Sequence, residues 1–396
     1  MSAALAPIGR DPRTGGYRRY AWTAEDATLR EWFAAEASDR GLDLTTDRAG
    51  NDWAWWGDPD RTPGIVTGSH LDSVPDGGAF DGPLGVASAF AALDALRAAG
   101  FAPSRPVGVV RFGDEEGARF GVACAGSRIL TGALPADRAA ALRDADAVTM
   151  AEAVTRAGHP SRAGHPSRVG EPPLTSDPEA MRRVATFVEL HVEQGRGLAE
   201  LDRPVAVGNS IWPHGRWRLD LPGQANHAGT TRLADRHDPM LALAAVIAAA
   251  RREADRAGCL ATVGKVRVLP NAVNAIPAEV SAWLDARGPD PDTVRALAAA
   301  VGRAGDAQPV EESFTGATRF DPRLVQQLAA LLEDAPVLAT GAGHDAGILA
   351  AAGVPSAMLF VRNPSGVSHS PAEHADLDDC LAGVRALTAA LAELAG

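Results

Sequence analysis

Histidines and acids occur in short polar segments that follow apolar runs of the sequence. GSHLDSV places His70 and Asp72 two residues apart, so an extended chain puts both on one face. Histidine is a good ligand for a metal of intermediate softness, and a neighbouring carboxylate fixes its tautomer. A His–Asp pair that only closes a loop is the alternative, and this segment alone does not decide between the two.

Two further segments carry carboxylates. GGAFDGPLGV holds Asp81 in a turn, where it could bridge two metals or form a common Asx turn. FGDEEGARFG places Asp114, Glu115 and Glu116 directly after the apolar run VGVVRF. Three adjacent acids repel each other unless positive charge compensates, and a metal pair would leave one Glu as ligand and its neighbour as general base. A solvated acidic loop is the alternative, and the apolar run before it argues against it.

Three more histidines stand in similar polar segments. They are His191 in ELHVEQG, His227 in GQANHAGTT and His369 in GVSHSPAEH. The chain has 10 histidines, and most of them would be unremarkable if seen singly. The weight comes from the set of His70, Asp81, the two adjacent glutamates, His191 and His369, each at the end of an element, and this set indicates a metal site.

Apolar runs alternate with amphipathic stretches in the first part of the chain. Segments 62–74, 105–117 and 185–195 are predicted to be buried strands that lead into polar loops, and 83–100 a helix closed by Gly100. Helices between such strands favour a mainly parallel sheet. Because ligands of open sheets bind beyond the carboxyl ends of the strands, the polar loops are expected to converge.

The pattern changes near Gly208 and returns near Phe320. Between them we expect strands at 216–224, 261–271 and 278–288, and helices at 238–258 and 291–305. The predicted fold class is therefore α/β, with a mainly parallel, mixed sheet between helices and an inserted α+β domain. The expected boundaries are 1–207 and 321–396 for the catalytic domain and 208–320 for the insertion.

Composition narrows the class of protein. A net charge of -12 argues against nucleic-acid binding, which needs a basic surface. No apolar run is long enough for a membrane span, and the first residues do not resemble a signal peptide. The three cysteines are far apart, which favours reduced thiols and a cytoplasmic location. The hexapeptide RAGHPS occurs twice, at 156–161 and 162–167, and is expected to lengthen an exposed loop.

Taken in order, these motifs resemble a known family. GSHLDSVPDGGAFDGPLGV, GDEEGARFG, LHVEQG, GQANHAGTT, NAVNAIP and GVSHSPAE together resemble the allantoate amidohydrolase and N-carbamoyl-L-amino-acid hydrolase branch of the dinuclear-metal aminoacylase/carboxypeptidase clan. The motifs extend from about residue 68 to residue 374, which is most of the chain.

The resemblance implies a role for each matching residue. One metal would be held by His70, Asp81 and His191, and the other by Asp81, Glu116 and His369. Asp72 would support His70, and Glu115 would activate the attacking water. His227 would stabilise the oxyanion across a dimer interface, and the inserted domain would be a lid and dimerisation domain. The residues implied to bind the substrate are Gln194, Arg216, Asn274 and Arg287.

The resemblance also implies the reaction. Related peptidases have an acid at the position of His191, so the histidine favours a ureido or carbamoyl substrate that carries a carboxylate. Allantoate is the first candidate, with N-carbamoyl-L-amino-acid hydrolase or β-ureidopropionase activity as the alternative. A metallo-aminopeptidase and a non-catalytic binding protein are further alternatives. The expected cofactors are two divalent ions per subunit, Zn or Mn, with Co or Ni also acceptable, and the expected assembly is a homodimer.

Overall fold

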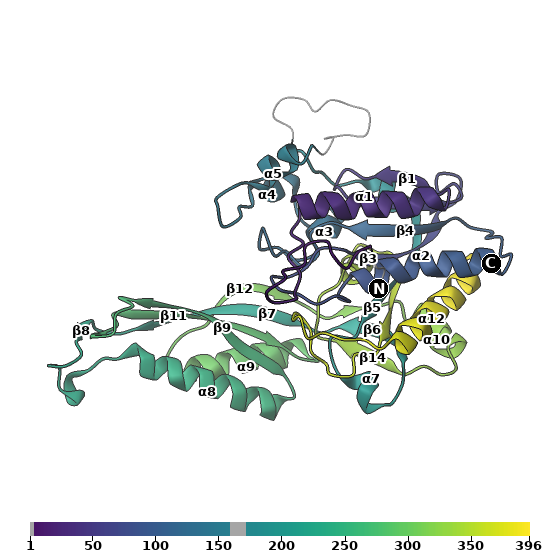
Figure 1. The fold of residues 1–396 in the computed structure, drawn as a ribbon. Helices are drawn as coiled ribbons and strands as arrows, with labels where there is room; N and C mark the ends of the chain where they lie inside the picture. Colours follow the sequence, from purple (N-terminus) through teal and green to yellow (C-terminus); the bar gives the residue numbers. More distant parts are fainter. Residues whose placement is uncertain (1–3, 159–171) are drawn as a thin grey trace. The chain divides into compact units, whose positions relative to one another are not determined.

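The computed structural model describes residues 4–158 and 172–396. The chain forms two compact units (Figure 1): unit 1 comprises the chain up to Ser210 and from Arg319 onward, and unit 2 is Ile211–Thr318. The chain passes from one unit to the other within β6 (Val205–Ile211) and β13 (Thr318–Arg319), a few residues from the boundaries expected at 208 and 320. Residues 159–167, which include most of the RAGHPS repeat, lie outside the described residues.

Unit 1 is built around one mixed sheet, which within the described residues has nine strands in the order β1-β2-β4-β3-β5-β15-β6-β13, with β14 paired to β6. The central pairs β4–β3, β3–β5 and β5–β15 are parallel, whereas β1–β2, β2–β4 and β15–β6 are antiparallel. Besides β6 and β13, the strands of this sheet are β1 (Asp43–Thr46), β2 (Asp52–Trp56), β3 (Gly64–His70), β4 (Val107–Phe112), β5 (Val184–Val192), β14 (Val337–Thr340) and β15 (Ser356–Val361). The predicted fold class, α/β with a mainly parallel sheet, is confirmed.

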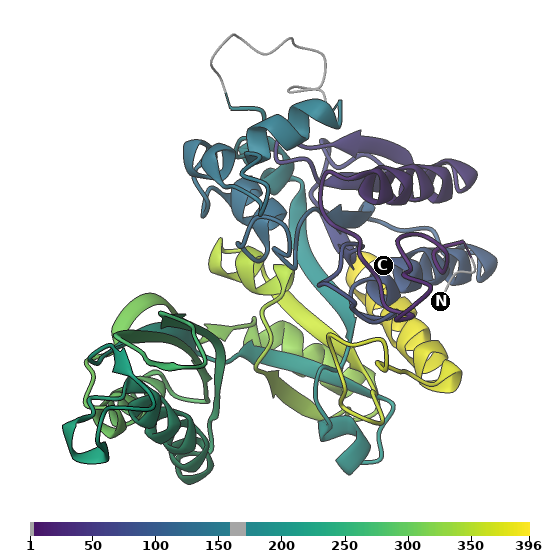
Figure 2. The ribbon, with the colours of Figure 1, turned by 60° about the vertical axis from the view of Figure 1, so that its left-hand side comes forward.

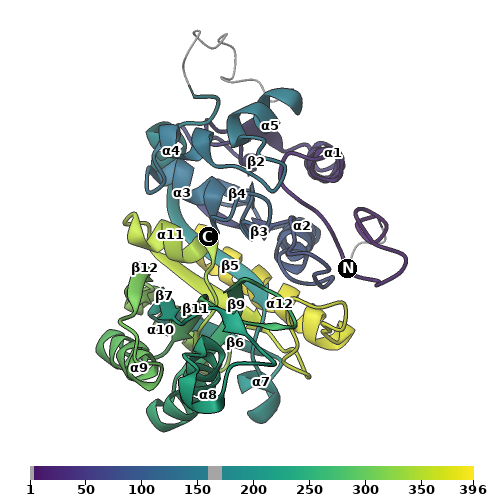
Figure 3. The ribbon, with the colours of Figure 1, turned by 90° about the vertical axis from the view of Figure 1, so that its left-hand side faces the viewer.

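Helices cover both faces of the central strands. Figure 3 shows α2 and α12 on one side of β3, β4 and β5, and α3 and α11 on the other. Residues of β3, β4 and β15 are buried throughout, as expected for parallel strands covered on both faces. The helices of unit 1 are α1 (Ala24–Asp39), α2 (Pro83–Ala98), α3 (Ala125–Thr131), α4 (Ala136–Ala141), α5 (Met150–Arg156), α6 (Pro178–Arg182), α7 (Gly197–Glu200), α10 (Pro322–Leu331), α11 (Asp345–Ala351) and α12 (Leu377–Ala395).

The long strand β5 and its parallel neighbour β15 run side by side through the middle of unit 1 (Figure 2). His191 of β5 pairs in register with Phe360 of β15, and Glu189 pairs with Gly68 of β3. Since β3, β4, β5 and β15 point the same way, the loops that follow them leave the sheet at one edge. This edge carries the polar segments noted in the sequence.

Unit 2 is a four-stranded antiparallel sheet, in the order β12-β7-β11-β9, with two helices packed on it. Apolar side chains of alternate strand positions, such as Leu219 and Leu221, form its core with Val246 of α8 and Val294 of α9. Asp238 and Asp290 cap the two helices, each with a proline at the first helical position. The elements of unit 2 are β7 (His214–Pro222), β8 (Asn226–His227), the 3-10 helix Leu233–Asp235, α8 (Pro239–Ala257), β9 (Leu260–Leu269), β10 (Ala275–Ile276), β11 (Glu279–Arg287), α9 (Pro291–Ala304) and β12 (Val310–Thr315).

None of the helices described is both long enough and apolar enough to cross a membrane.

Candidate metal centre

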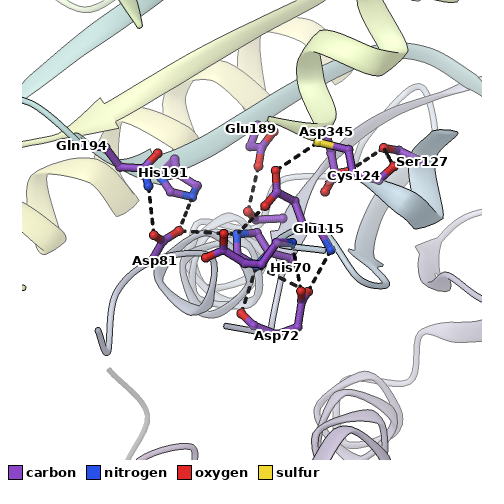
Figure 4. Close-up of polar contacts among 12 residues, drawn as sticks. His70, Asp72, Asp81, Glu115, Cys124, Ser127, Glu189, His191, Gln194 and Asp345 are labelled. Carbon is purple, nitrogen blue, oxygen red and sulfur yellow. Dashed lines mark hydrogen bonds and ion pairs between the residues drawn. The ribbon is translucent and has the colours of Figure 1, made fainter. Parts of the chain in front are cut away.

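Six of the predicted side chains meet at this edge of the central sheet, and Figure 4 labels His70, Asp81, Glu115 and His191 among them. His70 ends β3, the acidic segment with Glu115 and Glu116 follows β4, and His191 lies near the end of β5. Asp81 lies in the turn before α2, and His369 lies in the loop after β15. Loops that are far apart in the sequence are therefore brought together by the parallel strands that precede them.

Asp81 lies between two sets of ligand atoms. Its Oδ1 is 3.5 Å from Nε2 of His70 and 3.2 Å from Nε2 of His191, whereas its Oδ2 is 3.4 Å from Nε2 of His369. That nitrogen of His369 is also 3.5 Å from Oε2 of Glu116. Each carboxylate oxygen of Asp81 thus belongs to a separate group of three possible ligands.

These spacings fit a metal ion. Metal–ligand bonds of about 2.0–2.1 Å in a tetrahedral arrangement put neighbouring ligand atoms about 3.3 Å apart. The measured distances of 3.2 to 3.5 Å agree with that value. Within the described part of the chain, Nε2 of His70, Nε2 of His191 and Oε1 of Glu116 are buried atoms without a hydrogen-bond partner. Buried polar atoms are normally paired, so these three are free to coordinate a cation.

The turn that holds Asp81 depends on a glycine. Gly82 has φ of +80°, and a Cβ at this position would lie 2.5 Å from the ring of His70. Glycine therefore provides both the left-handed backbone and the close approach of the two ligand segments. Pro83 then begins α2 immediately. The carboxylate of Asp81 does not form an Asx turn, because among the described residues it accepts from the side chains of Gln194 and Ser368.

Asp72 holds the acidic loop. Its Oδ1 accepts a hydrogen bond from the backbone N–H of Glu115 at 3.1 Å, and its Oδ2 accepts one from the N–H of Glu116 at 3.0 Å. The same Oδ1 is 3.5 Å from Nδ1 of His70, and the carbonyl oxygen of Asp72 lies closer to that nitrogen, at 3.1 Å. Asp72 therefore contacts both the end of β3, which carries His70, and the acidic loop that carries Glu115 and Glu116.

The acidic loop is buried, so it is not a solvated loop. Asp114 and Glu115 are only 4% and 5% exposed. Burial raises the pKa of Glu115 well above its usual range, and Cys124 Sγ donates to its Oε1 at 3.1 Å. Its other oxygen, Oε2, is 3.8 Å from Nε2 of His70. One carboxylate oxygen of Glu115 is thus held by Cys124, while the other points toward the ligand cluster.

Titration in the cluster follows its geometry. Burial, and next the charge of Asp81, raises the pKa of Glu116 to about 8. Burial opposes ionisation of Asp81 as well, but contact with His191 and His70 outweighs it and lowers the pKa of Asp81 well below its usual range. Burial also opposes protonation of His191, yet Asp81 raises the pKa of His191. Not all carboxyl groups of the cluster can therefore be ionised at once. A bound cation would stabilise their ionised forms.

Gln194 lies at the centre of this site. Its Nε2 is a donor to Asp81 Oδ2 at 2.9 Å and to Ser368 Oγ at 3.1 Å, and it lies 3.3 Å from His369 Nε2. The prediction placed Gln194 in the substrate pocket. The structure brings its amide to the carboxylate of Asp81.

Sequence reasoning missed a second buried group beneath the histidines. The ring of His344 lies 4.5 Å from that of His191, and burial lowers the pKa of His344 well below its usual range. Asp345 accepts from Ser127, and Glu189 accepts from Ser69 and from the N–H of Ala346; Figure 4 shows these acids beside the ligands. The Gly-rich segment GAGHDAG at the start of α11 was the available signal.

The remaining predicted residues lie in unit 2, in two places. His227 on β8 pairs with Ala275 on β10, and the carbonyl of Asn274 accepts from the N–H of Ala228, so His227 and Asn274 share one end of the unit. Arg216 and Arg287 both approach Asp285, with Nε at 3.7 Å and 2.8 Å from its carboxylate oxygens.

Comparisons with known proteins agree with the resemblance of the motifs. Residues 66–393 match the family described as peptidase family M20/M25/M40. An N-carbamoyl-L-amino acid amidohydrolase of Geobacillus stearothermophilus is 34% identical over 97% of this chain and 94% of that protein. The allantoate amidohydrolase of Escherichia coli is 30% identical over 99% of this chain and 96% of that protein. A crystal structure of an amidase of the hydantoinase/carbamoylase family from Burkholderia multivorans aligns with a TM-score of 0.83 and 30% identity, over 99% of this chain and 95% of that one.

Proposed function

The chain belongs to peptidase family M20/M25/M40 and is a hydrolase of C–N bonds, and we propose that it is a dinuclear-metal amidohydrolase. Its proposed substrate is a small carboxylate with a ureido or carbamoyl group, and allantoate is the first candidate. Hydrolysis of such a group would release ammonia and carbon dioxide. The relatives named for allantoate and for N-carbamoyl amino acids support this substrate class.

The position of Asp81 carries the proposal. Its two oxygens face different ligand groups, one with His70 and His191 and the other with Glu116 and His369. A carboxylate in that position would supply one oxygen to each of two cations. His and carboxylate ligands accept Zn or Mn, and Co or Ni as well. Bound there, two divalent cations would lower the pKa of water and polarise the substrate carbonyl.

Glu115 is proposed as the general base. It would take a proton from the attacking water and deliver it to the leaving nitrogen. Burial raises the pKa of Glu115, and the contact of Oε1 with Cys124 leaves Oε2 turned toward His70. Asp72 would keep Glu115 and Glu116 in place through their backbone N–H groups.

The resemblance of the motifs also suggests which residues bind the substrate. Gln194 would bind substrate while it orients Asp81. In unit 2, Arg287 with Arg216 would bind the substrate carboxylate, since guanidinium groups hold carboxylates through paired hydrogen bonds. Asn274 would contribute an amide, and His227 would donate to the oxyanion that forms during attack. Unit 2 is the proposed lid and dimerisation domain.

A homodimer is proposed through unit 2. Strand β9 is at the edge of its sheet and largely exposed, and apolar side chains stand out from it and from α8, including Leu241, Ile247 and Leu260. An exposed edge strand with apolar neighbours is a surface that proteins normally cover. His227 is also exposed, which supports its action on the site of a second copy. A cytoplasmic location remains part of this proposal.

N-carbamoyl-L-amino-acid hydrolysis is the second candidate activity, because the Geobacillus relative with 34% identity carries that name. β-Ureidopropionase activity would need the same machinery with a different pocket. Related peptidases have an acid at the position of His191, so the histidine there, buried against Asp81, argues against an aminopeptidase.

One experiment tests both the centre and the substrate class. Metal-free protein is loaded with Mn²⁺ or Zn²⁺, the bound metal is counted, and ammonia release is measured with allantoate, N-carbamoyl amino acids, ureidoglycolate and dipeptides. We expect two metals per chain and turnover of a ureido or carbamoyl substrate. Two bound metals without turnover of any substrate in the panel would refute the activity, and one metal or none would refute the centre.

A further inference from the structure

Glu373 joins the two loops that carry Asp81 and His369. It lies four residues after His369 and is 5% exposed, so its carboxylate is inside the protein. Its Oε1 accepts hydrogen bonds from the backbone N–H groups of Phe80 and Asp81, both at 2.9 Å. Two consecutive peptide groups of the Asp81 turn are therefore held by one residue of the His369 loop.

The sequence of the turn leaves room for this contact. A Cβ on Gly78 would lie 2.4 Å from Oε1 and 2.5 Å from Cβ and Cδ of Glu373. Any side chain at position 78 would displace the carboxylate. A charged acceptor with two N–H donors is a strong hydrogen-bonding arrangement, and here it fixes the backbone of Asp81.

The second oxygen of Glu373 reaches the other side of the same site. Ser368 Oγ is 3.3 Å from Glu373 Oε2 and 3.4 Å from Asp81 Oδ2, and it receives a hydrogen bond from Gln194. Ser368 is the residue immediately before His369. The loop is fixed at its start by Asn363, which accepts from the N–H groups of Ser365 and Gly366. Glu373 fixes its other end.

The histidines differ in how much they need such support. His70 and His191 are 1% and 0% exposed on strands of the sheet, and Nδ1 of each contacts a backbone carbonyl. The side chain of His369 is 50% exposed, on a loop residue with φ of +54°. Packing positions the first two, whereas the position of His369 depends on its loop.

We propose that Glu373 is a positioning residue that sets the distance between Asp81 and His369, and so controls affinity for the cation held by Asp81, Glu116 and His369. The cation held by His70, Asp81 and His191 depends on Glu373 much less. This inference rests on the dinuclear centre proposed above. Groups that orient metal ligands typically contribute about 10-fold to 100-fold in metal affinity.

Mn²⁺ binding to metal-free protein tests the inference without recourse to turnover. Calorimetric titration gives the number of sites and the affinity of each for the wild type, Glu373→Ala, Glu373→Gln and Gly78→Ala. In Glu373→Ala and Gly78→Ala we expect one ion to bind about 10-fold to 100-fold more weakly and the other to change by less than about threefold. Glu373→Gln keeps an oxygen for both N–H donors and should recover part of the loss.

Asp177→Ala is the matched control. Asp177 is also a buried carboxylate that accepts from backbone N–H groups, those of Arg48, Glu179 and Ala180, but it caps α6. Asp177→Ala should bind both ions like the wild type even where its thermal stability falls. Unchanged affinity in Glu373→Ala, or equal weakening of both ions, would overturn the assignment to Glu373. A wild type that fails to bind two ions would instead overturn the dinuclear centre.

Discussion

Glu116→Gln should change how the stability of the metal-free protein depends on pH. Glu116 is packed beside Asp81 and is mostly buried, and burial with this neighbouring charge raises its pKa from 4.5 to about 8. Between these values the folded chain keeps a proton that the unfolded chain has lost. The free energy of unfolding therefore falls as pH rises through this interval. Below pH 4.5 Glu116 is protonated in both the folded and the unfolded chain, so its ionisation does not destabilise the fold there.

The size of the effect follows from the same numbers. One pKa unit between folded and unfolded chain is worth about 1.4 kcal/mol, so the full interval corresponds to roughly 5 kcal/mol. From about pH 5 to about pH 7.5, the wild type should lose on the order of 3 kcal/mol relative to Glu116→Gln, which cannot ionise. Saturating Mn²⁺ should abolish this loss in the wild type, because the cation binds the ionised carboxylate.

Urea unfolding followed by tryptophan fluorescence measures the difference. The metal-free wild type, Glu116→Gln and the exposed-site control Glu31→Gln are compared at several pH values. The free energy of unfolding of Glu31→Gln should change with pH as that of the wild type does. Glu116→Gln should become progressively more stable than both as pH rises. If the wild type and Glu116→Gln kept a constant difference across this range, the burial argument for Glu116 would be wrong.

Three further predictions concern catalysis. Glu115→Gln should bind two metals with turnover reduced by about 10²-fold to 10⁴-fold, measured as ammonia release beside metal content; near-normal activity with both metals bound would exclude the general-base role. Arg287→Ala should raise KM for carboxylate substrates far more than for their amides, and an equal effect on both would show that Arg287 does not bind the carboxylate. His227→Ala should lose about 10²-fold to 10³-fold in turnover and regain activity when mixed with Glu115→Gln, and failure to regain it would place His227 on its own chain's site.

The fold and the ligand cluster could be predicted because local and global signals agree. The segment 83–100 forms α2 (Pro83–Ala98), and 238–258 forms α8 (Pro239–Ala257), since proline at the start and glycine beyond the end mark both. Strands that are buried on both faces read as continuous apolar runs. Once such strands are parallel, the polar residues after them share one edge, so convergence of His70 and Glu116 needs no knowledge of tertiary contacts.

The contacts between loops could not be predicted in this way. Asp72 was expected to support His70, and its Oδ1 lies 3.5 Å from Nδ1 of that histidine, but nothing in the sequence predicted that its two oxygens also accept from the N–H groups of Glu115 and Glu116. The link from Glu373 to Asp81 spans 292 residues, and no periodicity of either segment encodes it. Backbone N–H groups are the donors in both cases, and every residue except proline has one. Sequence patterns identify which side chains can ligate, whereas the partners that hold them emerge only when the chain is folded.

Arg287 shows the same limit for substrate binding. A sequence shows that an arginine is present, but not which carboxylate it contacts. In the structure Arg287 Nε is 2.8 Å from Asp285 Oδ1, and Arg216 approaches the other oxygen of the same residue. A substrate carboxylate bound by Arg287 must therefore compete with Asp285 or share the guanidinium with it. Because Arg216 also approaches Asp285, Arg287 can turn to substrate without leaving that acid unpaired. Arg216→Ala should therefore raise KM for carboxylate substrates in two ways, by removing its own contact with the substrate and by making Asp285 hold Arg287 more firmly. If KM in Arg216→Ala equalled that of the wild type, neither role would stand.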